Sequence, residues 1–498
     1  MTHMVTRAKA LPRRLIQGGA AGDAGSAGGR VIASNVAVQL LARAITLSIS
    51  VVTVSLTART LDPTGYGVWS GASNFTGLFA VLTDLGLTTV AMQRMADDPE
   101  REHEWLGALA GGRVALSLLA TVVCAASVPL LLSGAHNAHA VALVLTLTIP
   151  MFSAGALMTV FSARLRAGLV LSVSVLQSSL WLIAVIALAI TNASVVQFAV
   201  AYVLLAVVIA AVQLQLTRRH ARIAWRAGAR LWRPLMRVAF PLGLAGVMIT
   251  IYYQVDSVLL LQISGARQAG IYGAAYGFLG PLLLLPGSVM ASFFPVLSAV
   301  IKPDPARARR LVQICADSMM IISLPILAGA IALAGPIIRL LYGPGFQGAA
   351  GLLPILMIAF VSICFGTIAG FLAPLIDRQW RLALYASIGA VANVALNLAL
   401  IPSYRAYGSA WATVATELLT MALMLGTALR TLKLRLSLGS TLRTLALAAA
   451  MTGVMVLARP LGLVPAGLIG VLFYAAGLFV LRIVDWRELQ AIRAQPVN

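Results

Sequence analysis

The stretch VIASNVAVQLLARAITLSISVVTVSLT, residues 31–57, decides the fold of this chain. It carries one charged residue, Arg43, and is longer than the ~20 apolar residues that a helix needs to cross a bilayer. Similar runs recur along all 498 residues, of which 60% are hydrophobic and 10% charged, and the mean hydropathy is +0.94. The sequence therefore predicts an all-α polytopic membrane protein.

The charge distribution predicts the orientation of these helices. We expect about 14 transmembrane helices, beginning near residues 32, 67, 107, 140, 169, 195, 238, 269, 311, 349, 382, 409, 443 and 465. Most of the 36 Lys and Arg residues then fall in segments on one side, which the positive-inside rule assigns to the cytoplasm together with both termini. The net charge of +21 is thus explained by the Lys and Arg residues of the cytoplasmic segments, and we expect no nucleic acid as a partner.

The predicted helices divide into two groups of six and a final pair. The first loop of each half supports a duplication, because Gly67-Val68-Trp69 aligns with Gly270-Ile271-Tyr272. Six helices per repeat give both halves the same orientation, so a pseudo-two-fold axis along the membrane normal relates them. We expect a basic cytoplasmic tail (1–31), an N-lobe (32–217), a basic cytoplasmic connector (218–237), a C-lobe (238–429), a last helix pair (443–482) and a cytoplasmic tail (483–498).

The polar residues of the first predicted helix lie on one helical face, polar from end to end: Asn35, Gln39, Arg43, Thr46, Ser50, Thr53 and Thr57. Hydrogen bonding between helices is one interpretation of such a stripe. Arg43 lies near the middle of the bilayer and favours the other, a water-filled cavity. The second predicted helix adds Asn74 and Asp84. Arg113 in the third faces the same interior or extends to the cytoplasmic interface.

The second half contributes three intramembrane carboxylates and no intramembrane base: Asp256, Asp317 and Glu417. Six charged side chains facing lipid would cost roughly 18 kcal/mol at ~3 kcal/mol each, more than most proteins can tolerate. They must therefore pair or face a shared interior, with an anionic substrate beside the first half and a coupling cation beside the second. Asp256 has an alternative interpretation as a protonated carboxyl bonded across helices, near Tyr252 or Tyr253.

Several motifs resemble one known family. LTARTLDPTGYGVW (56–69) and VLTDLGLTTVAMQRMA (81–96) resemble the opening of Wzx-type polysaccharide-biosynthesis flippases, and DSVLLLQISGARQAGIYGAAYGF (256–278) resembles their second half. LLYGPGFQGAAGLLPILMIAF (340–360) and ANVALNLALIPSYRAYGSAWATVATE (392–417) are the most specific matches. Ser409 and Arg405 depart from the family pattern, in which Ala and Gly are commoner. The resemblance implies the multidrug/oligosaccharidyl-lipid/polysaccharide exporter superfamily, with two six-helix lobes that rock around a central cavity.

This resemblance predicts a flippase rather than an enzyme, with no catalytic residue, no metal and no cofactor apart from a coupling H⁺ or Na⁺. The expected substrate is an undecaprenyl-pyrophosphate-linked oligosaccharide moved across a bacterial inner membrane, and membrane lipids, a polysaccharide polymerase and export proteins are expected partners. Candidate substrate-binding residues are Asn35, Gln39, Arg43, Asn74, Arg113, Asn393 and Asn397. Candidate ion-coupling residues are Asp84, Asp256, Asp317 and Glu417.

Three alternatives stay open. A lipid II flippase and a cation-coupled multidrug exporter belong to the same superfamily, although fourteen helices rather than twelve disfavour the exporter. A membrane polysaccharide polymerase is the remote alternative, because such enzymes carry a large loop or domain with carboxylates, and the predicted outside loops contain only Asp62 among acids. Cys124, Cys315 and Cys364 all lie in apolar runs, so we expect neither a disulfide framework nor a zinc site.

Overall fold

A computed structural model describes residues 24–132, 136–164, 167–376, 378–433, 437 and 439–481, with side chains described from residue 43 onward. These ranges form helices joined by short turns and contain no strand. Residues 1–23 of the expected N-terminal tail, the whole of the expected C-terminal tail (483–498) and residues 434–436 lie outside the described residues, whereas residues 24–31 belong to a helix. Thirteen helices in the described ranges are long and apolar enough to cross a membrane, and the protein is a multi-pass membrane protein.

The first of these helical segments contains two crossings. Helix α1 (Ala24–Ala80) is interrupted at Asp62, whose backbone (φ 58°, ψ 172°) is not helical and precedes Pro63. The chain turns there and continues through η3 (Val81–Thr83) into α2 (Leu87–Asp97). Counting the two parts of α1 separately gives 14 crossings and confirms the number predicted from the sequence.

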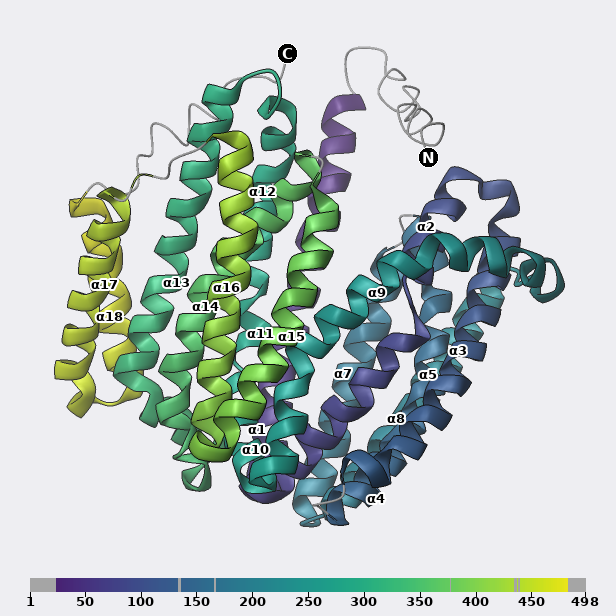
Figure 1. Cartoon of the computed structure of the whole chain (residues 1–498), viewed down its shortest axis with the longest axis horizontal. Helices are drawn as coiled ribbons and strands as arrows, with labels where there is room; N and C mark the ends of the chain where they lie inside the picture. Colours follow the sequence, from purple (N-terminus) through teal and green to yellow (C-terminus); the bar gives the residue numbers. More distant parts are fainter. Residues whose placement is uncertain are drawn as a thin grey trace.

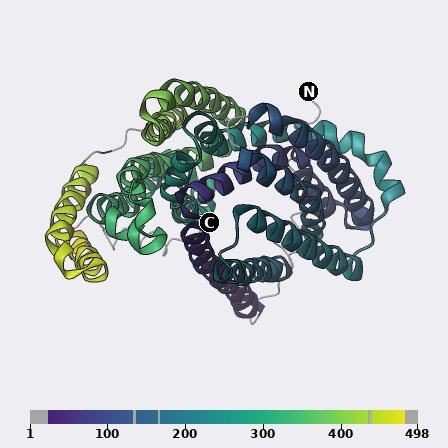
Figure 2. The same ribbon diagram turned by 90° about the horizontal axis from the view of Figure 1, so that it is seen from below.

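The helices form two bundles and a peripheral pair (Figure 1). The first bundle contains the second part of α1, then α2, η4 (Pro99–Arg101), α3 (Glu102–Leu131), α4 (His136–Thr146), α5 (Thr148–Gly155), η5 (Ala156–Met158), α6 (Thr159–Ala163), α7 (Ala167–Ile190) and α8 (Val195–His220). The second contains α10 (Ala266–Tyr276), α11 (Leu279–Leu282), α12 (Leu284–Val300), α13 (Pro305–Tyr342), η6 (Pro344–Phe346), α14 (Ala349–Leu375), α15 (Gln379–Tyr404) and α16 (Ala406–Leu432). The peripheral pair is α17 (Gly439–Ala458) and, after η7 (Arg459–Leu461), α18 (Leu463–Val480); it packs on α13 and lies at one edge of the molecule (Figure 2).

Helix α9 (Trp225–Ser264) crosses between the bundles. Its first part packs on α2 and α3, and its last part packs on α15. The sequence analysis placed a connector at 218–237, but only residues 221–224 of that range lie outside helices. Ala, Arg and Leu favour helix in this stretch, and the backbone N–H of Ala224 donates to the carbonyl of His103 at 3.1 Å. The start of α9 is therefore docked on the start of α3.

Two glycines bring the repeats into contact. A Cβ atom at Gly67 would lie 1.7 Å from the carbonyl oxygen of Ala266, and a Cβ atom at Gly270 would lie 1.9 Å from that of Pro63. The contact is reciprocal, since each glycine meets the residue four positions before its counterpart, as a two-fold axis requires. In Figure 1 the bundles meet at this end, beside the α1 and α10 labels, and diverge toward the opposite end.

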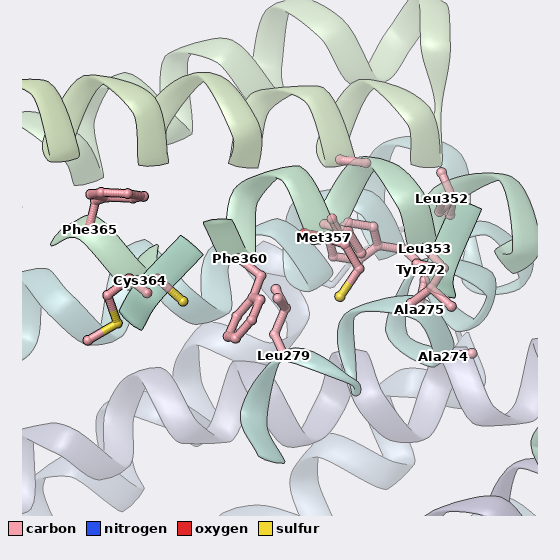
Figure 3. Packing of buried hydrophobic residues seen from close by; sticks show 14 of the residues in the cluster. Tyr272, Ala274, Ala275, Leu279, Leu352, Leu353, Met357, Phe360, Cys364 and Phe365 are labelled. Carbon is pink, nitrogen blue, oxygen red and sulfur yellow. The ribbon is translucent and has the colours of Figure 1, made fainter. Parts of the chain in front are cut away.

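The largest hydrophobic core lies in the second bundle and reaches across to the first. In this core Met357 of α14 lies beside Tyr272 of α10, and Phe360 of α14 lies beside Leu279 (Figure 3). Tyr66 of α1 belongs to the same cluster, and its ring centroid lies 5.8 Å from that of Phe346. This apolar contact holds the bundles together at the end that the charge distribution predicts to be outside.

Candidate functional site

Asp256 lies in a buried polar cluster at the meeting point of four helices. Its side chain on α9 is only 2% exposed. Carboxylate oxygen Oδ2 accepts hydrogen bonds from the hydroxyl groups of Tyr272 and Thr413, both at 2.9 Å. Oxygen Oδ1 accepts from Nδ2 of Asn397 at 2.8 Å. The donors come from α10, α16 and α15, so the carboxylate ties these helices to α9.

The amide of Asn397 has a fixed orientation in this cluster. Its Nδ2 donates to the backbone carbonyl of Asn393 at 2.9 Å as well as to Asp256. Its Oδ1 accepts from the hydroxyl group of Ser409 at 2.7 Å. Asp256 forms none of the ion pairs among the described residues, so neutral donors alone solvate its carboxylate.

Local sequence explains how these side chains meet. Asn393 and Asn397 are one helical turn apart on α15, and Ser409 and Thr413 are one turn apart on α16. A Cβ atom at Gly408 would lie 2.5 Å from the carbonyl oxygen of Leu400, so glycine permits the close approach of the two helices. Ser409 departs from the family pattern, and its hydroxyl group belongs to the cluster because it donates to Asn397.

Glu417 occupies the next layer of the second bundle. It lies one turn beyond Thr413 on α16, is 6% exposed, and forms no ion pair with the described residues. The hydroxyl group of Tyr252 is buried beside the carboxyl group of Glu417, although without a hydrogen bond of good geometry. Tyr252 and Tyr253 lie within about one turn of Asp256 on α9, as expected, but the tyrosine that donates to Asp256 across helices is Tyr272.

Arg113 and Asp84 form an ion pair in the first bundle. The same guanidinium donates to the hydroxyl groups of Thr88 at 3.1 Å and Thr83 at 3.3 Å, and to the carbonyl of Phe152 at 3.3 Å. Asp84 also accepts from the backbone N–H of Thr88 at 3.1 Å. The structure thus pairs Arg113, a candidate substrate-binding residue, with Asp84, a candidate ion-coupling residue, and their charges neutralise each other.

The other candidates of the first half of the chain are dispersed along α1. Arg43 is exposed on α1 and forms no ion pair within the described ranges. Asn74 is half-buried. The side chains of Asn35 and Gln39 lie outside the described residues. Thr53 and Thr57 are buried and donate to the carbonyls of Ile49 and Thr53 of their own helix, so the outer part of the polar stripe is a packing face rather than a cavity wall.

Asp317 lies apart from the Asp256 cluster. It accepts from Gln313 at 3.0 Å and from Ser440 of α17 at 2.5 Å, and therefore helps to hold the peripheral pair on α13. No group of His, Cys, Asp and Glu in the described ranges has the arrangement of a metal site, and the three cysteines are free and buried.

The sequence model of the family described as "Polysaccharide biosynthesis protein" matches residues 32–301, which is more than half of the chain. The chain belongs to this family. It is also 29% identical over 188 residues to a protein of Haloferax volcanii described as "Probable flippase AglR". That match covers 36% of this chain and 38% of the length of the relative.

The fold is similar to those of several solved structures. The structure of a lipid II flippase, MurJ, in an inward closed conformation has a TM-score of 0.72 at 15% identity. The match covers 91% of this chain and 98% of the MurJ chain. A multidrug transporter of the MATE family in an inward-facing conformation has a TM-score of 0.60 at 16% identity, covering 78% and 98%. The outward-facing form of such a transporter scores 0.50. The TM-scores are therefore higher for the inward closed and inward-facing structures than for the outward-facing one.

Proposed function

We propose that this chain is a flippase that moves an undecaprenyl-pyrophosphate-linked oligosaccharide from the inner to the outer leaflet of the bacterial inner membrane. Membership of the polysaccharide biosynthesis family supports this substrate class. Alternating access is the proposed mechanism. The bundles meet at the end predicted to be outside and diverge at the end carrying the basic start of α9, as an inward-facing state would. Both termini are then cytoplasmic.

One observation carries the mechanism: the intramembrane charges that lack counter-charges are divided between the lobes. Arg43 in the first lobe has no carboxylate partner among the described residues, whereas Asp84 compensates Arg113. Asp256 and Glu417 in the second lobe have no basic partner there. Unpaired charges in a membrane are costly and mark substrate and ion pathways. Arg43 is thus assigned to the pyrophosphate, and the two carboxylates to the coupling ion.

The Asp256 cluster suits a coupling role for H⁺ or Na⁺. It offers carboxylate, amide and hydroxyl oxygens within one buried volume, and oxygen ligands are those that hard cations prefer. Binding either ion would neutralise the carboxylate and change its hydrogen bonds to Tyr272 and Asn397. Because these residues lie on different helices, occupation of the site biases how α9 packs against α10 and α15.

The proposed substrate also predicts the functional neighbours. The flipped oligosaccharide would be consumed by a polysaccharide polymerase and export proteins on the outer side. Asn74, Asn393 and Asn397 were candidate sugar ligands. Of these, Asn393 and Asn397 are fully buried in the Asp256 cluster, which leaves half-buried Asn74 as the better sugar candidate.

The test is flipping in vesicles reconstituted with the purified full-length chain. A fluorescent undecaprenyl-pyrophosphate oligosaccharide is followed by the access of a membrane-impermeant quencher, with lipid II and a fluorescent organic cation as parallel substrates. We expect the oligosaccharide carrier to change leaflets faster than in protein-free vesicles, and faster than either alternative. Preferred movement of lipid II or of the cation would assign the chain to the corresponding alternative activity.

A further inference from the structure

The first bundle contains a cavity that none of the sequence-based candidates lines. Its volume is about 380 Å³, and it lies among α1, α4, α5, α7 and α8. This volume falls within the range of about 300–1,000 Å³ typical of ligand pockets. The side chains that give it its chemistry are Trp69, Ser73, Gln177, Ser178, Trp181 and Tyr202.

Aromatic rings form one wall of this cavity. The ring centroids of Trp69 and Trp181 are 5.8 Å apart with an interplanar angle of 20°. Tyr202 stands across both, with centroids 5.7 Å from Trp69 and 5.1 Å from Trp181 and steep interplanar angles of 87° and 73°. All three side chains are only half-buried. The aromatic cluster therefore keeps accessible ring surface beside the cavity instead of filling it.

The polar groups of the cavity are neutral and have free hydrogen-bonding capacity. Ser73, Gln177 and Ser178 make no hydrogen bond to any described residue, and neither does the hydroxyl group of Tyr202. Each can both donate and accept. No acidic or basic residue lines the cavity. The guanidinium of Arg113, paired with Asp84, donates to the backbone carbonyl of Phe152, a residue of the cavity wall.

This combination matches the chemistry of a sugar ring. A pyranose has apolar C–H faces that pack on aromatic rings, and a rim of hydroxyl groups that both donate and accept hydrogen bonds. A lipid tail would leave the amide and hydroxyl groups without hydrogen-bond partners, which is unfavourable. An organic cation would find aromatic rings but no carboxylate. A free phosphate would find no positive charge.

We propose that this cavity binds one neutral sugar residue of the translocated glycan, with Trp69, Trp181 and Tyr202 as the stacking wall and Gln177, Ser73 and Ser178 as the hydrogen-bonding groups. The proposal rests on the proposed flippase function and deepens it by assigning a sugar subsite to the first lobe. The cavity is small compared with an oligosaccharide, so one residue of the glycan enters while the remainder stays outside it.

The experiment measures binding rather than transport. The full-length chain in lipid nanodiscs is mixed with methyl glycosides of glucose, galactose, mannose and N-acetylglucosamine, and saturation transfer from protein to sugar protons is recorded by NMR. Gln177→Leu and Trp181→Leu are the test variants. Trp411→Leu is the matched control, because Trp411 is an exposed tryptophan of α16 outside the cavity. Trp181→Phe keeps an aromatic wall and guards against loss of fold.

We expect saturation transfer to at least one glycoside in the wild type and in Trp411→Leu. We expect affinity to fall at least tenfold in Gln177→Leu and Trp181→Leu, with partial recovery in Trp181→Phe. Absence of transfer to every glycoside, equal binding in all variants, or binding of tetraphenylphosphonium in place of sugars would overturn the subsite. A chain that flips the oligosaccharide carrier but binds no glycoside contradicts the subsite alone. A chain that binds glycosides but flips no carrier contradicts the flippase proposal.

Discussion

Arg113 and Asp84, from two different helical segments of the first lobe, form an ion pair that is 11% and 33% exposed at its two side chains. The guanidinium contacts two threonine hydroxyl groups and a backbone carbonyl in addition to the carboxylate. Its Nε is buried and has no partner among the described residues. The pair thus joins α3 to the segment between α1 and α2.

Removing one member of this pair leaves the other charge uncompensated. We expect Arg113→Gln to lower stability by about 1–3 kcal/mol, below the range for fully buried pairs because Asp84 retains some exposure. Arg113→Gln combined with Asp84→Asn should recover much of the loss. Thermal unfolding in detergent measures both. Losses that simply add in the double variant would show that the pair contributes nothing to the fold.

The glycine contact between the repeats predicts the direction in which an alanine substitution changes stability. Replacing a helical glycine by alanine normally stabilises a helix by up to about 1 kcal/mol. Gly67→Ala should instead lower the thermal unfolding temperature in detergent, because its Cβ would overlap the carbonyl of Ala266. Gly111→Ala on α3 meets no atom within 4 Å and is the control. Equal stability of the two variants would refute close contact of the repeats.

Sidedness is tested by reporter fusions. Fusions at Ala138, Gly265 and Tyr404 should report the outer side of the membrane, and those at Arg226 and Lys433 the cytoplasm, as the positive-inside rule requires. A single clear reversal would break the fourteen-crossing topology.

Arg43 is predicted to bind the pyrophosphate. Arg43→Ala should lower flipping at least tenfold while leaving the amount of protein in the membrane unchanged. Arg43→Lys should recover only part of the rate, because an ammonium group cannot bind a phosphate in bidentate fashion. Vesicle flipping assays at matched protein content give the answer. Wild-type rates in Arg43→Ala would remove this role.

The sequence predicted features that depend on local pattern. Crossing helices follow from apolar length, and the aligned Gly67 and Gly270 predicted the repeat that the reciprocal contact displays. The spacing of Asn393 and Asn397 placed both amides on one face. The sequence did not predict which side chains from separate helices pair with each other, because these pairs depend on how the helices pack. Tyr272 rather than Tyr252 therefore pairs with Asp256, and Asp84 pairs with Arg113.

The aromatic cavity was missed for a related reason. Trp69, Trp181 and Tyr202 come from three helices and look like ordinary apolar residues in their own segments. Polar periodicity found the stripe on α1 but not its environment, so Thr53 and Thr57 were placed on a cavity wall although they bond within their own helix. The residues of the basic stretch before residue 238 favour helix, and this propensity could have predicted that α9 begins at Trp225 rather than near residue 238.

We propose that the Asp256 cluster couples an ion gradient to flipping. Asp256→Asn keeps the size of the side chain and removes its charge. The amide oxygen can still accept from Asn397, and the amide nitrogen can donate to the hydroxyl groups of Tyr272 and Thr413. Flipping of the undecaprenyl-pyrophosphate oligosaccharide is measured in vesicles under a proton or a sodium gradient, with Glu417→Gln in parallel. Asp317→Asn is the control, because that residue lies at the α13–α17 contact.

The decisive measurement is the ratio of flipping rates with and without the gradient in wild type and Asp256→Asn. We predict that one of the two gradients accelerates the wild type and Asp317→Asn. In Asp256→Asn this ratio should fall to one while substrate binding is retained. Wild-type acceleration in Asp256→Asn and Glu417→Gln under both gradients would contradict the account, because the buried carboxylates would then have only a structural role.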